Sequence, residues 1–176
     1  MAADQSISLP QLEAFCHAAF AAIGADAATT DAATRAMLHG TRYGVDSHGV
    51  RLLPHYLMAL EGGRLNRNPE LKRVGGFGAV EVWDADHAQG ALGSYHGMAR
   101  AIELARQFGL GAAAIRNSSH FGPAGAYALA AAQAGFIGIA FCNSDSFVRL
   151  HDGAMRFHGT NPISVAVPVQ GDNPWF

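Results

Sequence analysis

Two short stretches of the chain place residues that can move protons beside residues that form turns. In the first, GVDSHGVRLLPHY, Ser47 and His48 stand just before Arg51. Histidine is the side chain whose ordinary pKa suits proton transfer near neutral pH, and an arginine can bind a carboxylate through two parallel hydrogen bonds. This stretch therefore contains the parts of a site that binds an acid and exchanges a proton with it.

The same stretch also fits the start of a helix with no chemical role. Pro54 loses no hydrogen bond within a first helical turn, so it marks a beginning and not a break. Asp46 or Ser47 would then cap the helix, and His48 and Arg51 would be solvated. The residues alone leave both interpretations open.

The second stretch, RNSSHFGPAGAYA, lies where an expected strand ends and an expected helix begins. Ligands bind at such strand ends in α/β proteins, and free N–H groups at a helix start suit an anionic group such as a pyrophosphate. The polar run from Asn117 to His120 needs partners at the end of a buried strand, and a ligand is one candidate. A structural histidine is the alternative for His120. Gly122 and Gly125 do not form G-x-G-x-x-G, so the Rossmann fingerprint is absent.

The third stretch, FHGTNPISVAVP, reads as a turn before a strand, with Thr160 inside the turn and Pro162 favouring extended backbone before it. No G-x-S-x-G or Walker motif occurs in the sequence, and His151 and His158 lack the spacing of metal ligands. We therefore expect no metal site.

The composition is that of a globular protein. Of the 176 residues, 49% are hydrophobic and 15% are charged, and the net charge is −2 with no cluster of Lys or Arg. This balance argues against nucleic acid and membrane surfaces as partners and leaves small molecules or protein. No apolar run approaches the roughly 18 residues of a membrane span, and the N-terminus lacks a signal-peptide pattern, so the expected location is the cytoplasm.

Hydrophobic periodicity predicts a helical beginning followed by alternating strands and helices, which is a mixed α/β fold. Ser8 and Gln11 predict a capping box for a first helix whose apolar positions include Phe15 and which ends at Gly24. The other expected helices cover residues 30–40, 50–61, 94–108 and 123–134, and the expected strands cover residues 79–86, 111–118, 137–144 and 164–169.

Two organisational expectations follow from these elements. The polar stretch at residues 66–69 divides a helical N-terminal portion, residues 1–68, from an α/β portion, residues 69–176. Within the second portion, a buried strand at residues 111–118 leads through a helix to the strand at residues 137–144. This order predicts a βαβ crossover, right-handed if the two strands are parallel.

Taken in order, the three stretches resemble the malate/L-lactate dehydrogenase family of type 2. The segments that carry the resemblance are GVDSHGVRLLPHYLMALEGGRLN, NSSHFGPAGAYALAAAQAGFIGIAFCNS and GTNPISVAVP. The resemblance runs from the first helix to the end of the chain and implies a non-Rossmann α/β fold of which this chain is the N-terminal half. Residues 69–176 would then be a cofactor-binding portion that is incomplete at its C-terminus.

The family resemblance also implies a reaction. Its members transfer a hydride between NAD or NADP and C2 of a small 2-oxo or 2-hydroxy acid, such as malate or lactate. Cyclic ketimines, ureidoglycolate and sulfolactate are alternative substrates within the group. A homodimer is implied as well, and NAD and NADP are equal candidates.

Site residues carry over position by position. His48 matches the proton donor to the substrate in the reduction direction, with Ser47 in relay, and Thr160 matches a substrate-contacting threonine. Many members carry their carboxylate-binding arginine at the position of Leu52, whereas Arg51 lies one residue earlier, which on a helix is a rotation of about 100°. His120 is a further catalytic candidate, and the residues that match the lining of the nicotinamide end are His120, Phe121, Gly122, Pro123 and Ala124.

Two other classes of function stay open. A truncated homologue could fold without holding a complete cofactor site and would then have no activity. A small-molecule binding module could use the sheet edge without any chemistry.

Overall fold

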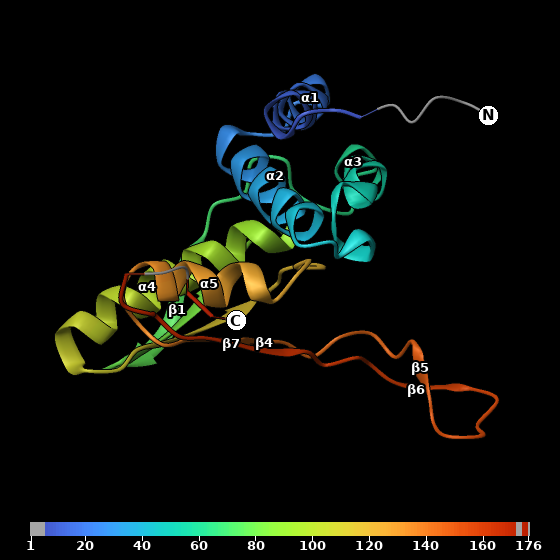
Figure 1. The fold of residues 1–176 in the computed structure, drawn as a ribbon. Coiled ribbons are helices and arrows are strands. Elements are labelled where there is room, and N and C mark those ends of the chain that lie inside the picture. The colour runs from blue at the N-terminus through green and yellow to red at the C-terminus, as the bar shows by residue number, and fades with distance from the viewer. Residues whose placement is uncertain (1–5, 172–173, 176) are drawn as a thin grey trace. The chain divides into compact units, whose positions relative to one another are not determined.

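The structure is a computed structural model that describes residues 6–171 and 174–175 (Figure 1). It has the predicted mixed α/β fold, and the described residues form two compact units. The first unit contains the described chain up to Gly75 together with Val82–Ser94 and Ala114–Pro123. The second unit contains Gly76–Glu81, Tyr95–Ala113 and the described residues from Ala124 onward. The expected division at residues 66–69 stays a prediction.

Three helices form the core of the first unit. They are α1 (Leu9–Ala22), α2 (Ala27–Arg42) and α3 (Leu53–Glu61), and Figure 1 shows them side by side. The predicted capping box is confirmed, since the Gln11 amide donates to Ser8 Oγ and the Ser8 amide donates to Gln11 Oε1. Asp26 caps α2 by accepting a hydrogen bond of 2.7 Å from the Thr29 amide.

The buried face of α1 differs from the predicted one. Cys16 and Phe20, one helical turn apart, are completely buried, whereas Phe15 is 59% exposed. Position 15 lies about 100° of rotation from position 16, so the stripe centred on Cys16 turns Phe15 away from the core. Tyr56 and Leu60 of α3 complete the same cluster.

Arg67 ties the ends of the three helices together. Its Nη1 donates to the carbonyl of Ile23 (2.8 Å), just after α1, and its Nε and Nη2 donate to the carbonyls of Leu60 and Glu61 (both 3.0 Å) in α3. Its own carbonyl accepts a hydrogen bond of 2.9 Å from the amide of Asp26, the cap of α2. The last carbonyls of a helix have no partners within it, so one side chain satisfies groups that two helices leave open.

A three-stranded sheet has the order β1 (Lys72–Phe77), β2 (Val80–Asp84) and β3 (Ala112–Arg116), and α4 (Gly90–Phe108) precedes β3 in the chain. The prediction that β3 is buried is wrong, because its residues alternate between exposed and half-buried. It is one of the two edge strands of this sheet, and an edge strand has a neighbour on one side only.

The second unit is built on α5 (Gly125–Gln133), which packs against an antiparallel pair, β4 (Gly138–Phe141) and β7 (Ile163–Ala166). The predicted βαβ crossover is wrong, because β4 pairs with β7 and not with β3. The small residues of the ladder face α5, and a Cβ at Gly138 would lie only 2.3 Å from the Ala128 carbonyl oxygen. Strands β5 (Val148–Arg149) and β6 (Arg156–His158), which the sequence did not predict, form a hairpin between β4 and β7.

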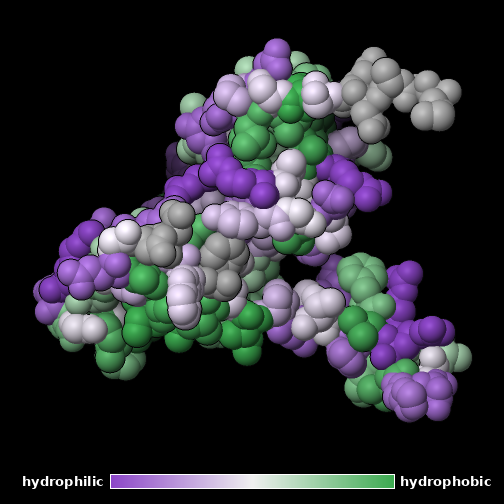
Figure 2. Space-filling view, viewed as in Figure 1, coloured by the Kyte–Doolittle hydropathy of each residue, from purple (hydrophilic) through white to green (hydrophobic). Residues whose placement is uncertain are grey.

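The other face of the β4–β7 ladder is apolar and exposed. Figure 2 shows hydrophobic side chains gathered over these strands. They alternate with the small residues because successive side chains of a strand point to opposite faces. The exposed residues of this face are Ile139, Phe141, Ile163 and Val165.

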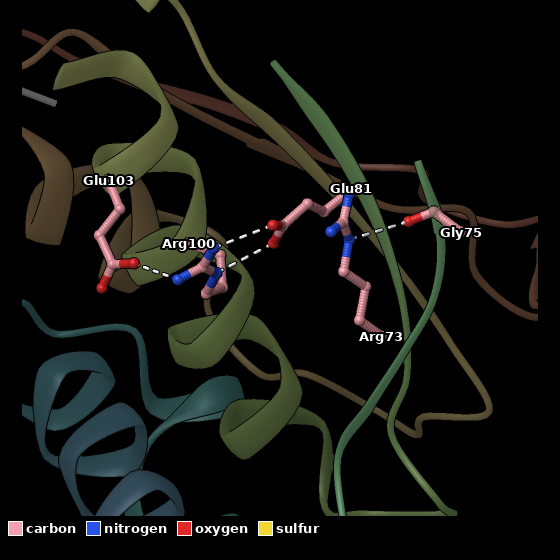
Figure 3. Close-up of polar contacts among 5 residues, drawn as sticks. All are labelled: Arg73, Gly75, Glu81, Arg100 and Glu103. Carbon is pink, nitrogen blue, oxygen red and sulfur yellow. Dashed lines mark hydrogen bonds and ion pairs between the residues drawn. The ribbon is translucent and has the colours of Figure 1, made fainter. Parts of the chain in front are cut away.

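A buried carboxylate in the second unit is neutralised by an arginine. Glu81, 3% exposed, accepts two hydrogen bonds of 2.9 Å from Arg100, which also pairs with Glu103 (Figure 3). A planar guanidinium fits a carboxylate in this two-bond manner, so the buried negative charge is compensated.

Within the part of the chain that the structure describes, no helix is long and apolar enough to cross a membrane.

We predict that Arg67→Ala lowers the free energy of unfolding by about 2–4 kcal/mol, because three carbonyls lose a charged hydrogen-bond donor. Urea unfolding followed by circular dichroism measures the change. The control is Arg42→Ala, which removes an exposed arginine from the last turn of α2 and should cost less than about 1 kcal/mol. An equal loss in the two variants would contradict the helix-tying role of Arg67.

Candidate active site

His48 lies in a pair of short 3₁₀ turns, η1 (Asp46–His48) and η2 (Val50–Leu52), which precede α3. The expectation that Asp46 or Ser47 caps a helix is wrong, since neither turn has a side-chain cap and α3 begins only at Leu53. Ser47 instead places its Oγ 2.9 Å from His48 Nδ1. Pro54 falls in the first turn of α3, as predicted.

The backbone of the His48 turn packs directly on α2. A Cβ at Gly40 would lie 2.5 Å from the His48 carbonyl oxygen, and a Cβ at Gly49 would lie 2.7 Å from Thr41 Oγ1. The same Thr41 hydroxyl accepts a hydrogen bond of 3.0 Å from the Val50 amide. Because no side chain separates the turn from the helix, the position of His48 is determined by backbone contact.

Tyr56, on the buried face of α3, joins His120 to this helix. Its hydroxyl lies 2.9 Å from His120 Nδ1, and the side chain is 2% exposed. Burial raises the pKa of Tyr56, so the phenol keeps its proton. The hydroxyl has no other hydrogen-bond partner among the described residues, and a buried O–H without an acceptor is costly. We therefore infer that Tyr56 donates to Nδ1, which places the single proton of a neutral His120 ring on Nε2.

The polar run that leads to His120 is held by protein partners. Asn117 donates a hydrogen bond of 2.8 Å to Asp84 Oδ2, and its carbonyl accepts one of 2.8 Å from the His87 amide. Ser119 Oγ accepts a hydrogen bond of 3.1 Å from the Gly90 amide at the start of α4. Much of the polarity that suggested a ligand in the sequence therefore serves to shape the turn.

The backbone of His120 also meets the start of α4. A Cβ at Gly90 would lie 2.4 Å from the carbonyl oxygens of both Ser119 and His120. The buried Gln89 side chain donates to the His120 carbonyl at 3.5 Å. His120 is thus held by its backbone on α4 and by its ring on α3.

Three histidines and one arginine come together here. The ring centroids of His48 and His120 are 5.5 Å apart and those of His55 and His120 are 6.5 Å apart, while Arg64 Nη2 lies 3.5 Å from His55 Nε2. We call His48, His55 and His120 the imidazole cluster. Neither His48 nor His120 has a hydrogen-bond partner for Nε2 among the described residues, so both nitrogens remain available to a ligand.

Desolvation by its neighbours lowers the pKa of His120, and electrostatic interaction with His48, His55 and Arg64 lowers it further. At neutral pH His120 is therefore uncharged and can donate or accept a hydrogen bond without carrying a charge. The ring of His120 bonds to a buried phenol, whereas the neighbouring ring of His48 bonds to an exposed serine. Such a difference in environment can give two neighbouring side chains different roles, one as an acid and the other as a neutral hydrogen-bonding group.

The other predicted site residues are distributed over both units. Arg51 is exposed in η2 and forms no hydrogen bond or ion pair with any residue that the structure describes, whereas Leu52 packs against the core. Phe121, Gly122 and Pro123 follow His120 in the first unit, and Gly122 is buried with a φ of +75°.

Ala124 and Thr160 belong to the second unit. Ala124 is buried directly before α5, without a side chain that caps the helix. Thr160 is exposed, and its Oγ1 lies 3.3 Å from Ser144 Oγ. The Ser144 amide donates a hydrogen bond of 2.9 Å to Oδ1 of the neighbouring Asn161. Among the described residues, no group of three or more His, Cys, Asp or Glu side chains could hold a metal ion.

Comparison with known proteins decides the family. A sequence model described as malate/L-lactate dehydrogenase matches residues 7–176. The chain belongs to this family. A 2,3-diketo-L-gulonate reductase of Shigella boydii serotype 4 is 37% identical over 162 residues, which are 92% of this chain and 49% of that protein. The protein of the same description from Escherichia coli K12 is 36% identical over the same length.

Solved structures of family members share the fold. A malate dehydrogenase from Pyrococcus horikoshii OT3 superposes with a TM-score of 0.92 at 32% identity, covering 97% of this chain and 49% of that one. A Δ1-piperideine-2-carboxylate reductase from Pseudomonas syringae gives 0.86 at 26% identity, covering 97% and 51%. The chain therefore has the predicted fold of the family and spans about half the length of the relatives it matches.

Sequence reasoning about this family member did not find Tyr56, His55 or Arg64. The helical spacing of Leu53, Tyr56 and Leu60 could have placed Tyr56 on the buried face of α3. Its partner His120 is 64 positions away, and no local pattern signals that contact. His55 and Arg64 are nine positions apart, a distance that helical periodicity does not connect.

We predict that Gly40→Ala displaces the His48 turn and costs about 1–3 kcal/mol, because the added methyl group would meet backbone atoms. Gly63→Ala is the control: its φ of +73° makes the substitution unfavourable, but its Cβ would meet nothing. NMR signals of the His48 ring should move in the first variant only. Unchanged His48 signals in Gly40→Ala would contradict this packing.

We predict that His120 titrates below the ordinary value of about 6.5 for histidine. A lowered folded-state pKa contributes stability above the unfolded value, and this contribution is lost as the pH falls through the folded value. NMR titration of the ring measures the pKa directly. In Tyr56→Phe the Nδ1 signal should shift toward that of an unbonded nitrogen; an identical Nδ1 signal would show that the phenol is not its partner.

Proposed function

We propose that this chain contributes the proton-transfer site of an oxidoreductase that acts on small 2-oxo and 2-hydroxy acids. The observation that carries the proposal is the pair of imidazoles, His48 and His120, at 5.5 Å with both Nε2 atoms available. Family membership supports the class of reaction. The names of its relatives support it too, since they describe a diketogulonate reductase, malate and sulfolactate dehydrogenases and a piperideine carboxylate reductase.

His48 is the proposed proton donor in the reduction direction. When C2 of a 2-oxo acid accepts a hydride, negative charge develops on its oxygen, and a protonated imidazole at this oxygen lowers the barrier. Ser47 Oγ accepts a hydrogen bond from Nδ1 of the protonated ring, which leaves Nε2–H directed to the substrate. Ser47 then relays the replacement proton. In the oxidation direction the neutral His48 takes the proton back.

His120 acts beside it as a neutral group. With Tyr56 on Nδ1, its Nε2–H donates a hydrogen bond to the substrate or to the nicotinamide carboxamide without competing for the transferred proton. This division of roles agrees with the lowered pKa of His120.

The residues around His120 fit the reactive end of a nicotinamide cofactor. The available Nε2 and the side-chain-free backbone of Gly122 suit a planar carboxamide, and Phe121 and Pro123 are the neighbouring residues that would hold it together with Ala124. NAD or NADP supplies the hydride when bound. Both cofactors are candidates.

The substrate class is an acid with a reducible carbon next to its carboxylate. Arg51 is the arginine that the sequence predicts to bind this carboxylate, and Thr160 is the residue predicted to contact the substrate through its hydroxyl. Malate-like and lactate-like acids come first, with a cyclic ketimine, ureidoglycolate or sulfolactate as alternatives. The homodimer and the cytoplasmic location expected from the sequence belong to the same proposal.

A homologue without activity is the second candidate. The chain spans about half the length of the relatives it matches, 49% for the diketogulonate reductase of Shigella boydii. Fluorescence titration with NADH and NADPH, followed by a panel of 2-oxo acids, separates the two. Cofactor binding with turnover supports the oxidoreductase, and folded protein without cofactor binding supports the alternative.

We predict that His48→Ala lowers kcat by about 10² to 10⁴-fold, because the proton donor is lost. Affinity for NADH or NADPH should stay unchanged, since the donor contacts the substrate. His151→Ala, at a fully exposed histidine of the second unit, is the matched control and should keep full activity. A kcat for His48→Ala equal to that of the parent chain would refute the assignment.

A further inference from the structure

Arg64 occupies a particular place beside the imidazole cluster. It follows the glycine pair that ends α3, and its side chain reaches back along this helix to His55 in the first turn. Arg64 Nη2 donates to His55 Nε2 at 3.5 Å, and both side chains are exposed. A guanidinium has five N–H donors, so four remain after this contact.

The groups that act electrostatically on His120 are all basic. They are His48, His55 and Arg64, and none of them is acidic. Arg100 and Arg116 pair with carboxylates elsewhere in the chain. Arg64 forms no ion pair with any carboxylate among the residues that the structure describes.

An anion would satisfy this arrangement. A carboxylate beside Arg64 would accept two parallel hydrogen bonds from the guanidinium and would offset its positive charge. It would also lie next to His55, whose ring presents Nδ1–H when Nε2 accepts from Arg64.

We propose that Arg64 and His55 form a subsite for an anionic group of the substrate, next to the imidazole cluster. The assignment rests on the proposed function in one respect, namely that the substrate is an acid. Arg51 is the alternative guanidinium, but it forms no hydrogen bond with a described residue of the cluster that would hold it there. Arg64 has such a contact.

The subsite can hold either of two groups of an acid. If the subsite binds the carboxylate next to the reacting carbon, the affinities for lactate and for malate depend on Arg64 equally. If the subsite binds a second anionic group, only the affinity for malate depends on Arg64, and the subsite then selects acids with two negative charges. Both cases use the same hydrogen bonds.

The experiment measures binding without cofactor or turnover. NMR signals of the His55 and His120 rings are followed in the full chain while L-lactate or L-malate is added. In Arg64→Ala we expect the dissociation constant for malate to rise about tenfold or more. The dissociation constant for lactate should rise as well if the subsite binds the carboxylate next to the reacting carbon. Arg64→Lys keeps the charge but loses the paired donors, so its dissociation constant should lie in between.

A second measurement tests the electrostatic contact itself. Arg64→Gln removes a positive charge near His120, so the pKa of His120 should rise. Arg42→Ala removes an exposed arginine of α2 and serves as the control for both measurements, in which it should match the parent chain.

The proposal is overturned if the parent chain binds neither acid. It is overturned as well if Arg64→Ala binds both acids like the parent chain, or if Arg51→Ala alone abolishes binding. Loss of binding in Arg64→Ala without any turnover by the parent chain would support the subsite and refute the oxidoreductase. The two proposals can therefore fail separately.

Discussion

The hydrogen bond between Tyr56 and His120 is the contact on which the arrangement of the site depends. It joins residues 64 positions apart, and it brings the turn after β3 onto the buried face of α3. The phenol is almost completely buried and has one hydrogen-bond partner among the described residues, so moving His120 away would leave a buried hydroxyl unsatisfied. The contact therefore restrains the ring and also selects which of its nitrogens carries the proton.

The two catalytic candidates are positioned by backbone contacts on different helices. Gly40 of α2 lies against the His48 carbonyl, and Gly90 of α4 lies against the carbonyl of His120. At both points a side chain would occupy the space that the turn needs. The helices therefore restrain the backbone of both histidines, while Arg67 holds the ends of α1 and α3 at one point.

The electrostatics of the site agree with an acidic substrate. His48, His55 and Arg64 are the groups that act electrostatically on His120, and the lowered pKa of its ring keeps it uncharged beside His48. Such a setting favours an anion at the site. The family of malate/L-lactate dehydrogenases, to which the chain belongs, includes members named for acids of this kind.

Features that depend on neighbouring residues can be predicted from the sequence: the capping box at Ser8, the start of α3 near Pro54, the main helices, and the family through its ordered motifs. Which surfaces those elements bury, and which side chains they bring together, follows from the packing of the whole chain. The structure shows that β3 is an edge strand, that β4 pairs with β7, and that Tyr56 contacts His120. The reason is physical, because capping and periodicity act over a few residues, whereas strand pairing and side-chain contact depend on how distant segments pack.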